Sequence, residues 1–451
     1  MAITDVDAER APRRPSLRQS FQSLQLPAYR AWFLSQVFSA SGTMTQSVAM
    51  AWFLLRLTGS SIELGLMGTF TFLPVLLLSP HAGALVDRVD RRKLLIGTQS
   101  ALGLIAAAAA AVIASGAARD WMLFLIAAAT GTVAAADSTA RQVYVVDLVG
   151  ADRVASAIGL YEIILNVSRV VGPSLGGVLL ATVGVAACCA VNAASYAIPL
   201  FVLLRYKPAY APAHAPTARL ADGRADAREQ AGDHGKSDGR GQAAVSLRAG
   251  IRYAWRHGPV RVCIALAAAS ALLFNLSVAL PVLATRTFHL GGGGYGLMMA
   301  AFGVGALPGA LLAASGQGSP TGRRVGWLAL ATAVSIGGTA FAPATWLAVL
   351  GLGAVGCLSI WFIAAASTLV QLATAPGMRG RMMGLWTMAL PGTQVVNGPL
   401  AGWVTQDAGP REGFALSGMA LAAVALAGWR ALTSVPRVPE AGEDQVVGSR
   451  L

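Results

Sequence analysis

The sequence predicts an all-α membrane protein built as two six-helix bundles that are related by a pseudo-two-fold axis. Composition and an internal repeat predict this fold class. Of the 451 residues, 55% are hydrophobic and 12% are charged, whereas a soluble chain is typically about 25% charged. A membrane-spanning helix needs roughly 20 apolar residues, so about twelve spans occupy more than half of the chain. We therefore expect lipid to be its main solvent.

The apolar windows are separated by short polar segments. They lie at 31–55, 62–86, 94–116, 121–140, 154–182, 185–204, 260–285, 295–315, 325–342, 345–370, 382–405 and 413–432. The stretch between the sixth and seventh windows is rich in Ala, Gly, Pro, Asp and Arg, which predicts a flexible linker. The expected domains are an N-terminal tail (1–30), a first bundle (31–205), the linker (206–257), a second bundle (258–433) and a C-terminal tail (434–451).

Basic residues predict the orientation in the membrane. If both termini are cytoplasmic, most arginines and lysines fall on the cytoplasmic side, as the positive-inside rule requires. The opposite side then holds Arg56, Arg119, Arg286 and Arg411. No short apolar core precedes the first span, so we expect residues 1–30 to be a cytoplasmic tail and not a cleaved signal peptide.

The two halves of the chain repeat. Residues 138–142 read STARQ and residues 367–371 read STLVQ, and the span after each contains a Gly-Pro pair, at Gly172–Pro173 and at Gly398–Pro399. Parallel six-helix repeats are a known transporter plan, with the binding site between the halves near the middle of the membrane. The repeat therefore predicts a transporter.

Several other classes of function are disfavoured. The net charge of +13 would suit nucleic-acid binding only if the basic residues gathered on one surface, but here they interrupt apolar runs. No nucleophile and base can be paired, so we expect no catalytic site. The cysteines lack the spacing of a zinc site. No complete phosphate loop is present, so we expect no nucleotide cofactor and no metal.

The loop between the second and third spans carries a charged motif. It contains Gly83, Asp87, Arg88, Asp90, Arg91 and Arg92. This pattern resembles the cytoplasmic loop signature of the major facilitator superfamily, in the form found in its enterobactin-exporter and macrolide-efflux branch. We interpret the loop as a gate in which Asp87 faces the positive end of a neighbouring helix. Alternatively, the charges only anchor the loop on the cytoplasmic side.

The fifth span carries a glycine pattern similar to the superfamily's antiporter motif. Its members are Gly159, Gly172, Pro173, Gly176 and Gly177, and Ser168 replaces one glycine of the motif. Small residues let helix backbones approach closely, and a proline bends a helix. The span is thus expected to seal one half-channel, although ordinary small-residue packing would use the same residue types.

Charged residues inside spans are costly and therefore functional candidates. Asp137 and Arg141 lie in the fourth span, and Glu162, Asn166 and Arg169 share a face of the fifth. Our hypothesis is that Asp137 or Glu162 exchanges a proton while the arginines hold carboxylates or an anionic substrate. Static ion pairing that fixes helix packing is the alternative.

The resemblance covers nearly the whole chain outside the tails and the linker. It implies alternating access and proton-coupled efflux of a small molecule from the bacterial inner membrane, with siderophores, macrolides and other drugs as substrate classes. A proton gradient would be the energy source, membrane lipid the surroundings and a monomer the working unit. Proton-coupled uptake would use the same fold. A non-transporting membrane sensor is a further alternative, but the chain offers no output domain.

Overall fold

The helices of the first half follow the predicted spans closely. The computed structural model describes residues 22–150, 153–207, 255, 258–270, 276–314, 320–374 and 379–434. The helices of the first half are η1 (Gln22–Gln25), α2 (Pro27–Thr58), α3 (Ser61–Arg88), α4 (Arg91–Ala114), α5 (Asp120–Val149), α6 (Val154–Thr182) and α7 (Val185–Arg205). Local sequence explains several boundaries, because Gly59 ends α2 with a φ of 68° and the Ser60 and Asp90 side chains cap α3 and α4.

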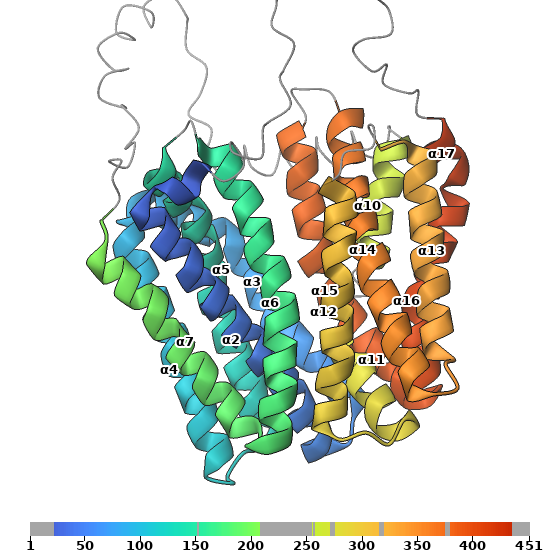
Figure 1. The fold of residues 1–451 in the computed structure, drawn as a ribbon, viewed down its shortest axis with the longest axis horizontal. Helices are drawn as coiled ribbons and strands as arrows, with labels where there is room; N and C mark the ends of the chain where they lie inside the picture. The colour runs from blue at the N-terminus through green and yellow to red at the C-terminus, as the bar shows by residue number, and fades with distance from the viewer. Residues whose placement is uncertain are drawn as a thin grey trace, which may run out of the picture.

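The second half repeats this arrangement. Its helices are α10 (Gly258–Ser270), α11 (Leu276–Val282), η4 (Leu283–Thr287), α12 (Gly292–Ala314), α13 (Gly322–Ala340), α14 (Thr345–Ala373), α15 (Arg379–Asp407), α16 (Pro410–Ala427) and α17 (Trp429–Thr433). Figure 1 shows the two halves as two groups of roughly parallel helices standing side by side. The predicted fold class, with two six-helix bundles, is confirmed. The predicted linker and tails lie almost wholly outside the described residues, so the domain boundaries stay predictions.

Seven of the described helices contain an apolar stretch long enough to cross a membrane by length and composition: α3, α4, α5, α6, α7, α12 and α14. The helix α2 is more polar because it carries Ser35, Gln36, Ser39, Ser41 and Thr45, all of which are buried. Polar residues of this kind form hydrogen bonds between helices inside a bundle.

The two ends of the bundles differ in how the halves meet. We call the end at which α3 gives way to α4 the Asp90 end, and the end at which α2 gives way to α3 the Gly59 end. At the Asp90 end, one hydrophobic cluster contains only residues of the first half, among them Trp32 and Tyr144. Towards the Gly59 end the cores cross between the halves, since Trp52 packs into the core of the second half and Val282 into the core of the first.

Two helix pairs make most of the described seam between the halves, α3 with α15 and α6 with α12. Each pair joins the second helix of one half to the fifth helix of the other, as a pseudo-two-fold axis requires. In Figure 1 the two groups of helices come together at the Gly59 end and diverge towards the Asp90 end. In the described residues the halves are therefore packed most closely at the Gly59 end, where Gly177 lies against Gly296.

Candidate functional site

The predicted charges of the fourth span form a buried ion pair. Asp137 and Arg141 lie four residues apart on α5, one helical turn, and Arg141 Nη2 donates to Asp137 Oδ2. Asp137 is 2% exposed. The sequence placed both residues on one helix, and the structure brings their side chains together.

Other helices complete this pair. The Thr98 hydroxyl and Gln99 Nε2, both on α4, each donate to Asp137 Oδ1 over 2.8 Å. From α2, Gln36 Oε1 accepts from Arg141 Nη1 over 2.6 Å. Thr98 and Gln99 did not stand out in the sequence, because they are uncharged and lie near the start of a long apolar run. The pair therefore joins three helices of the first half.

Three buried polar atoms of this cluster have no hydrogen-bond partner in the described part of the chain: Gln36 Nε2, Gln99 Oε1 and Arg141 Nε. Such atoms are rare in native structures and point to a bound water or to a functional role. Two of the atoms are donors and one is an acceptor, so the cluster can take up a further polar group without breaking the Asp137–Arg141 pair.

The candidates of the fifth span are only partly placed. Glu162, Asn166 and Arg169 all lie within α6, but the side chains of Glu162 and Asn166 are outside the described residues. Arg169 is half-buried, and its backbone carbonyl lies against Gly303 of α12. The predicted pairing of Glu162 with Arg169 stays a prediction.

The described hydrogen bonds of the charged loop all join it to other residues of the first half. Asp90 Oδ1 caps α4 by accepting from the Lys93 amide over 3.0 Å. Arg91 Nη1 donates to both carboxylate oxygens of Asp147 on α5, over 2.7 and 2.9 Å. Arg92 donates to the carbonyls of Leu203 and Leu204, in the last turn of α7. Asp147, which sequence reasoning missed, ties the loop to the end of α5.

Among the described residues, the rest of the charged loop makes no contact across the seam that would show a gate. Arg88 is exposed, and a Cβ added at Gly83 would meet open space. The side chain of Asp87 lies outside the described residues. In this conformation the described bonds of the loop thus hold the Asp90 ends of α4, α5 and α7 together, and the gating role stays a prediction.

The antiporter motif packs α6 against two neighbours at once. Gly172 and Gly176 face α2 of the same half, and a Cβ at Gly176 would lie 3.2 Å from the Thr45 carbonyl. The Thr45 hydroxyl also donates to the Gly172 carbonyl over 2.8 Å. Gly177 faces α12 across the seam, where a Cβ would lie 2.6 Å from the Gly296 Cα. Gly159 lies near the start of α6, and its own surroundings are outside the described residues.

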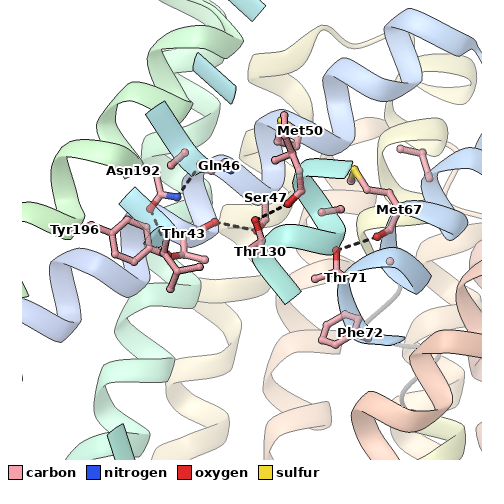
Figure 2. Close-up of a pocket in the computed structure, with 16 residues that line it drawn as sticks. Thr43, Gln46, Ser47, Met50, Met67, Thr71, Phe72, Thr130, Asn192 and Tyr196 are labelled. Atoms are coloured by element: carbon pink, nitrogen blue, oxygen red, sulfur yellow. Dashed lines mark hydrogen bonds between the residues drawn. The ribbon is translucent and has the colours of Figure 1, made fainter. Parts of the chain in front are cut away.

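A cavity of about 180 Å³ lies inside the first half at the middle of the helices (Figure 2). Its lining comes from α2, α3, α4, α5 and α7: Thr43, Gln46, Ser47, Met50, Leu64, Met67, Gly68, Thr71, Phe72, Leu102, Ala106, Ile126, Ala127, Thr130, Asn192 and Tyr196. The sequence alone does not bring these five helices together around one cavity.

One wall of the cavity is a hydrogen-bonded cluster. Asn192 Nδ2 donates to Gln46 Oε1 over 2.7 Å. The Thr43 hydroxyl lies 3.1 Å from the Tyr196 hydroxyl and 3.5 Å from Asn192 Oδ1. The side formed by α3 carries Met67, Phe72 and Thr71, whose hydroxyl donates to the Met67 carbonyl over 2.9 Å (Figure 2). This arrangement can hold a small amphipathic group.

Sequence reasoning also missed a carboxylate near the Gly59 end. Glu63 lies in the first turn of α3, and its Oε2 atom is buried without a hydrogen-bond partner in the described residues. It stood beside a loop in the sequence and was not counted among the residues inside spans. Among the described residues, no group of three or more His, Cys, Asp or Glu side chains could hold a metal ion.

Comparison with known sequences supports a transporter. Residues 18–230 match the family model described as transmembrane secretion effector, and residues 262–449 match that of the major facilitator superfamily. The enterobactin exporter EntS of Citrobacter koseri is 28% identical over 89% of this chain and 90% of its own length.

Other relatives match over a shorter region. The staphyloferrin A transporter of Staphylococcus aureus is 29% identical over 33% of this chain. The multidrug efflux pump Tap of Mycobacterium tuberculosis is 32% identical over 35% of this chain. These two matches span 38% and 39% of the respective relative, so they concern one part of each protein.

Solved structures share the fold. The D-xylose-proton symporter aligns with a TM-score of 0.66 at 14% identity, over 93% of this chain and 98% of that one. The nucleoside transporter NupG aligns with a TM-score of 0.64 at 14% identity, over 90% of this chain and 100% of that one. With family models matched in both halves and this fold, the chain belongs to the major facilitator superfamily.

Proposed function

We propose that this protein is a proton-coupled exporter of a small molecule that works by alternating access. The observation that carries the proposal is the seam, which is packed at the Gly59 end through Gly177–Gly296 and Gly65–Gly398. A transporter that alternates must seal one end at a time. The exporters among the relatives support the direction of transport.

The orientation follows from charge. The Asp90 end carries Arg88, Arg91, Arg92 and Lys93, whereas the Gly59 end carries Arg56 and Arg286 among few basic residues. By the positive-inside rule, this distribution supports a cytoplasmic Asp90 end. We propose that the protein lies in the bacterial inner membrane with both termini cytoplasmic and works as a monomer, facing inward in the conformation described.

Three carboxylates are candidates for the proton site. Asp137 is held by three donors, Glu162 lies on the fifth span, and Glu63 has a buried oxygen that no described residue bonds. A carboxylate that changes partners as the halves move can take up a proton in one conformation and release it in the other. Moving one charge down 100 mV supplies about 2.3 kcal/mol, which sustains a gradient of roughly 40-fold.

Transport measurements in vesicles of both orientations test the proposal. Inverted vesicles, whose interior is acidified by respiration, would be offered enterobactin, staphyloferrin A and a macrolide, with right-side-out vesicles as the comparison. Accumulation in inverted vesicles alone, abolished by a protonophore, would support proton-coupled export. Accumulation in right-side-out vesicles would instead support uptake by symport and would overturn the proposed direction.

The same assay separates the three carboxylates. Glu63→Gln, Asp137→Asn and Glu162→Gln would each be measured with an imposed pH gradient and, separately, in counterflow without one. Loss of gradient-driven transport with counterflow retained identifies the coupling residue. If all three variants keep gradient-driven transport, the coupling assignment is wrong.

A further inference from the structure

We infer that the cavity of the first half binds an uncharged, ring-sized group that accepts hydrogen bonds, and that uncharged amphipathic molecules are therefore the substrate class. The statement about substrates rests on the proposed function. The statement about the cavity rests on three observations: its volume, the absence of a charged residue from its lining, and the donors along one wall.

The volume fits one ring. At about 180 Å³ the cavity slightly exceeds the engineered apolar cavity of about 150 Å³ that binds benzene in another protein. That apolar cavity stays dry, whereas this one has polar groups on one side and so favours a ring with a polar substituent. A larger substrate would place one ring here and leave the remainder outside.

The lining disfavours an ionised group. Its sixteen residues include no Asp, Glu, Lys or Arg. Arg141 and Asp137 lie within electrostatic reach of Tyr196, and they already bind each other. A carboxylate or ammonium group in the cavity would therefore be desolvated without a counter-charge, which is unfavourable inside a membrane protein.

The polar wall favours an acceptor. Gln46 uses its Oε1 atom to accept from Asn192, and its Nε2 group makes no hydrogen bond within the described residues. Asn192 donates to Gln46 and also forms a side-chain hydrogen bond with Tyr196, so its donors are occupied. The Gln46 amide thus has donors to spare, and a carbonyl or ether oxygen on the ring would satisfy them. An apolar ring would leave them unpaired.

The cavity has an entrance beside α3. Ser47 is exposed, and a Cβ added at Gly68 would meet no atom within 4 Å. Both residues belong to the lining, on α2 and α3. The helix α11 of the second half contacts both of these helices, so the entrance lies near the seam.

Gly68 provides a variant that should fill the cavity without disturbing the fold. A leucine there would project into free space, and leucine favours a helix over glycine. Gly97 on α4 is the matched control, because a Cβ there also meets no atom within 4 Å and the residue is not part of the lining. Gly68→Leu and Gly97→Leu thus add the same side chain inside and outside the cavity.

Binding of fluorinated one-ring probes tests the inference directly. The probes are 4-fluorobenzamide, 4-fluorobenzoate, 4-fluorobenzylammonium and 4-fluorotoluene, followed by fluorine NMR with the full chain in lipid nanodiscs. Empty nanodiscs correct for partition into lipid. We expect the benzamide to bind at least tenfold more tightly than each of the other probes. Equal binding of benzoate or of benzylammonium would overturn the inference.

The variants localise the binding. Gly68→Leu should weaken benzamide binding at least tenfold, while Gly97→Leu leaves it unchanged. Tyr196→Phe, which removes one hydroxyl from the polar wall, should weaken it about threefold, with Tyr206→Phe at the end of α7 as its control. Unchanged binding in both Gly68→Leu and Tyr196→Phe would overturn the assignment of the site.

The inference and the proposed function can fail separately. If wild-type vesicles show no transport but the benzamide binds with the expected pattern, the exporter proposal fails, together with the substrate class, and the binding site stands. If transport is proton-driven but all four probes bind equally or not at all, the export proposal stands and the inference about the cavity is wrong.

Discussion

Gly177 of α6 lies directly against Gly296 of α12, so the backbones of the two halves touch at this point. A Cβ on Gly177 would lie 2.6 Å from the Gly296 Cα, closer than real side-chain contacts allow. The Trp52 and Tyr295 rings stack nearby, with centroids 6.2 Å apart, also across the seam. Gly177 is the last glycine of the predicted antiporter motif. One residue of this motif therefore packs the two halves together at the Gly59 end.

Gly177→Ala should therefore open the Gly59 end. Overpacking costs about 1–3 kcal/mol, which corresponds to a shift of about 5- to 150-fold against this conformation. Labelling of Ser61→Cys with an impermeant maleimide, with the native cysteines replaced by alanine, would measure the change, because Ser61 is buried and bonded to Gln406 across the seam. Gly97→Ala is the control. An unchanged labelling rate would mean that the seam is looser than described.

Asp137→Asn should destabilise the first half more than the double variant Asp137→Asn/Arg141→Gln. Removing one partner of a buried ion pair costs about 3–5 kcal/mol, because the other charge stays buried and unpaired. Replacing both partners removes that charge. Unfolding temperatures in nanodiscs would measure the destabilisation of the single and double variants. A loss in the double variant equal to the sum of the losses from the two single substitutions would show that the two side chains are not coupled.

Arg92→Ala should lower the unfolding temperature, and Lys93→Ala should not. The Arg92 guanidinium binds two carbonyls at the end of α7, and its loss is expected to cost about 1–3 kcal/mol. The Lys93 side chain is exposed, and surface substitutions usually stay within about 0.5 kcal/mol. Equal effects of the two substitutions would contradict the described binding of the loop to α7.

Single cysteines should report opposite sides of the membrane. Val89 is 39% exposed and lies at the Asp90 end, and Val183 is 69% exposed and lies at the Gly59 end. In intact cells an impermeant maleimide should label Val183→Cys but not Val89→Cys, and inverted vesicles should show the reverse. The opposite pattern would invert the proposed orientation and, with it, the side from which substrate enters.

The helices could be predicted because lipid imposes a simple rule on sequence. Each span must be apolar over about 20 residues, so the predicted window 154–182 matches α6 (Val154–Thr182) residue for residue. The Asp137–Arg141 pair could be predicted for a similar reason, since residues four apart share a helix face. Both inferences use information local to one helix.

The rest of the site depends on how helices pack. Thr98, Gln99 and Gln36 come from two other helices, and nothing in their own surroundings marks them as partners of Asp137. Asp147 could not be linked to Arg91 without knowing that α4 lies beside α5. The cavity combines five helices, so its shape follows from tertiary packing alone.

The seam and the cavity use different parts of the polypeptide. At Gly65–Gly398 and Gly177–Gly296 the halves meet through main-chain atoms, whereas the cavity is defined by side chains such as Asn192 and Tyr196. Mutations that reshape the cavity can thus leave the machinery of movement intact. A chain built in this way could acquire new cargo by exchanging a few side chains while its rocking motion stays the same.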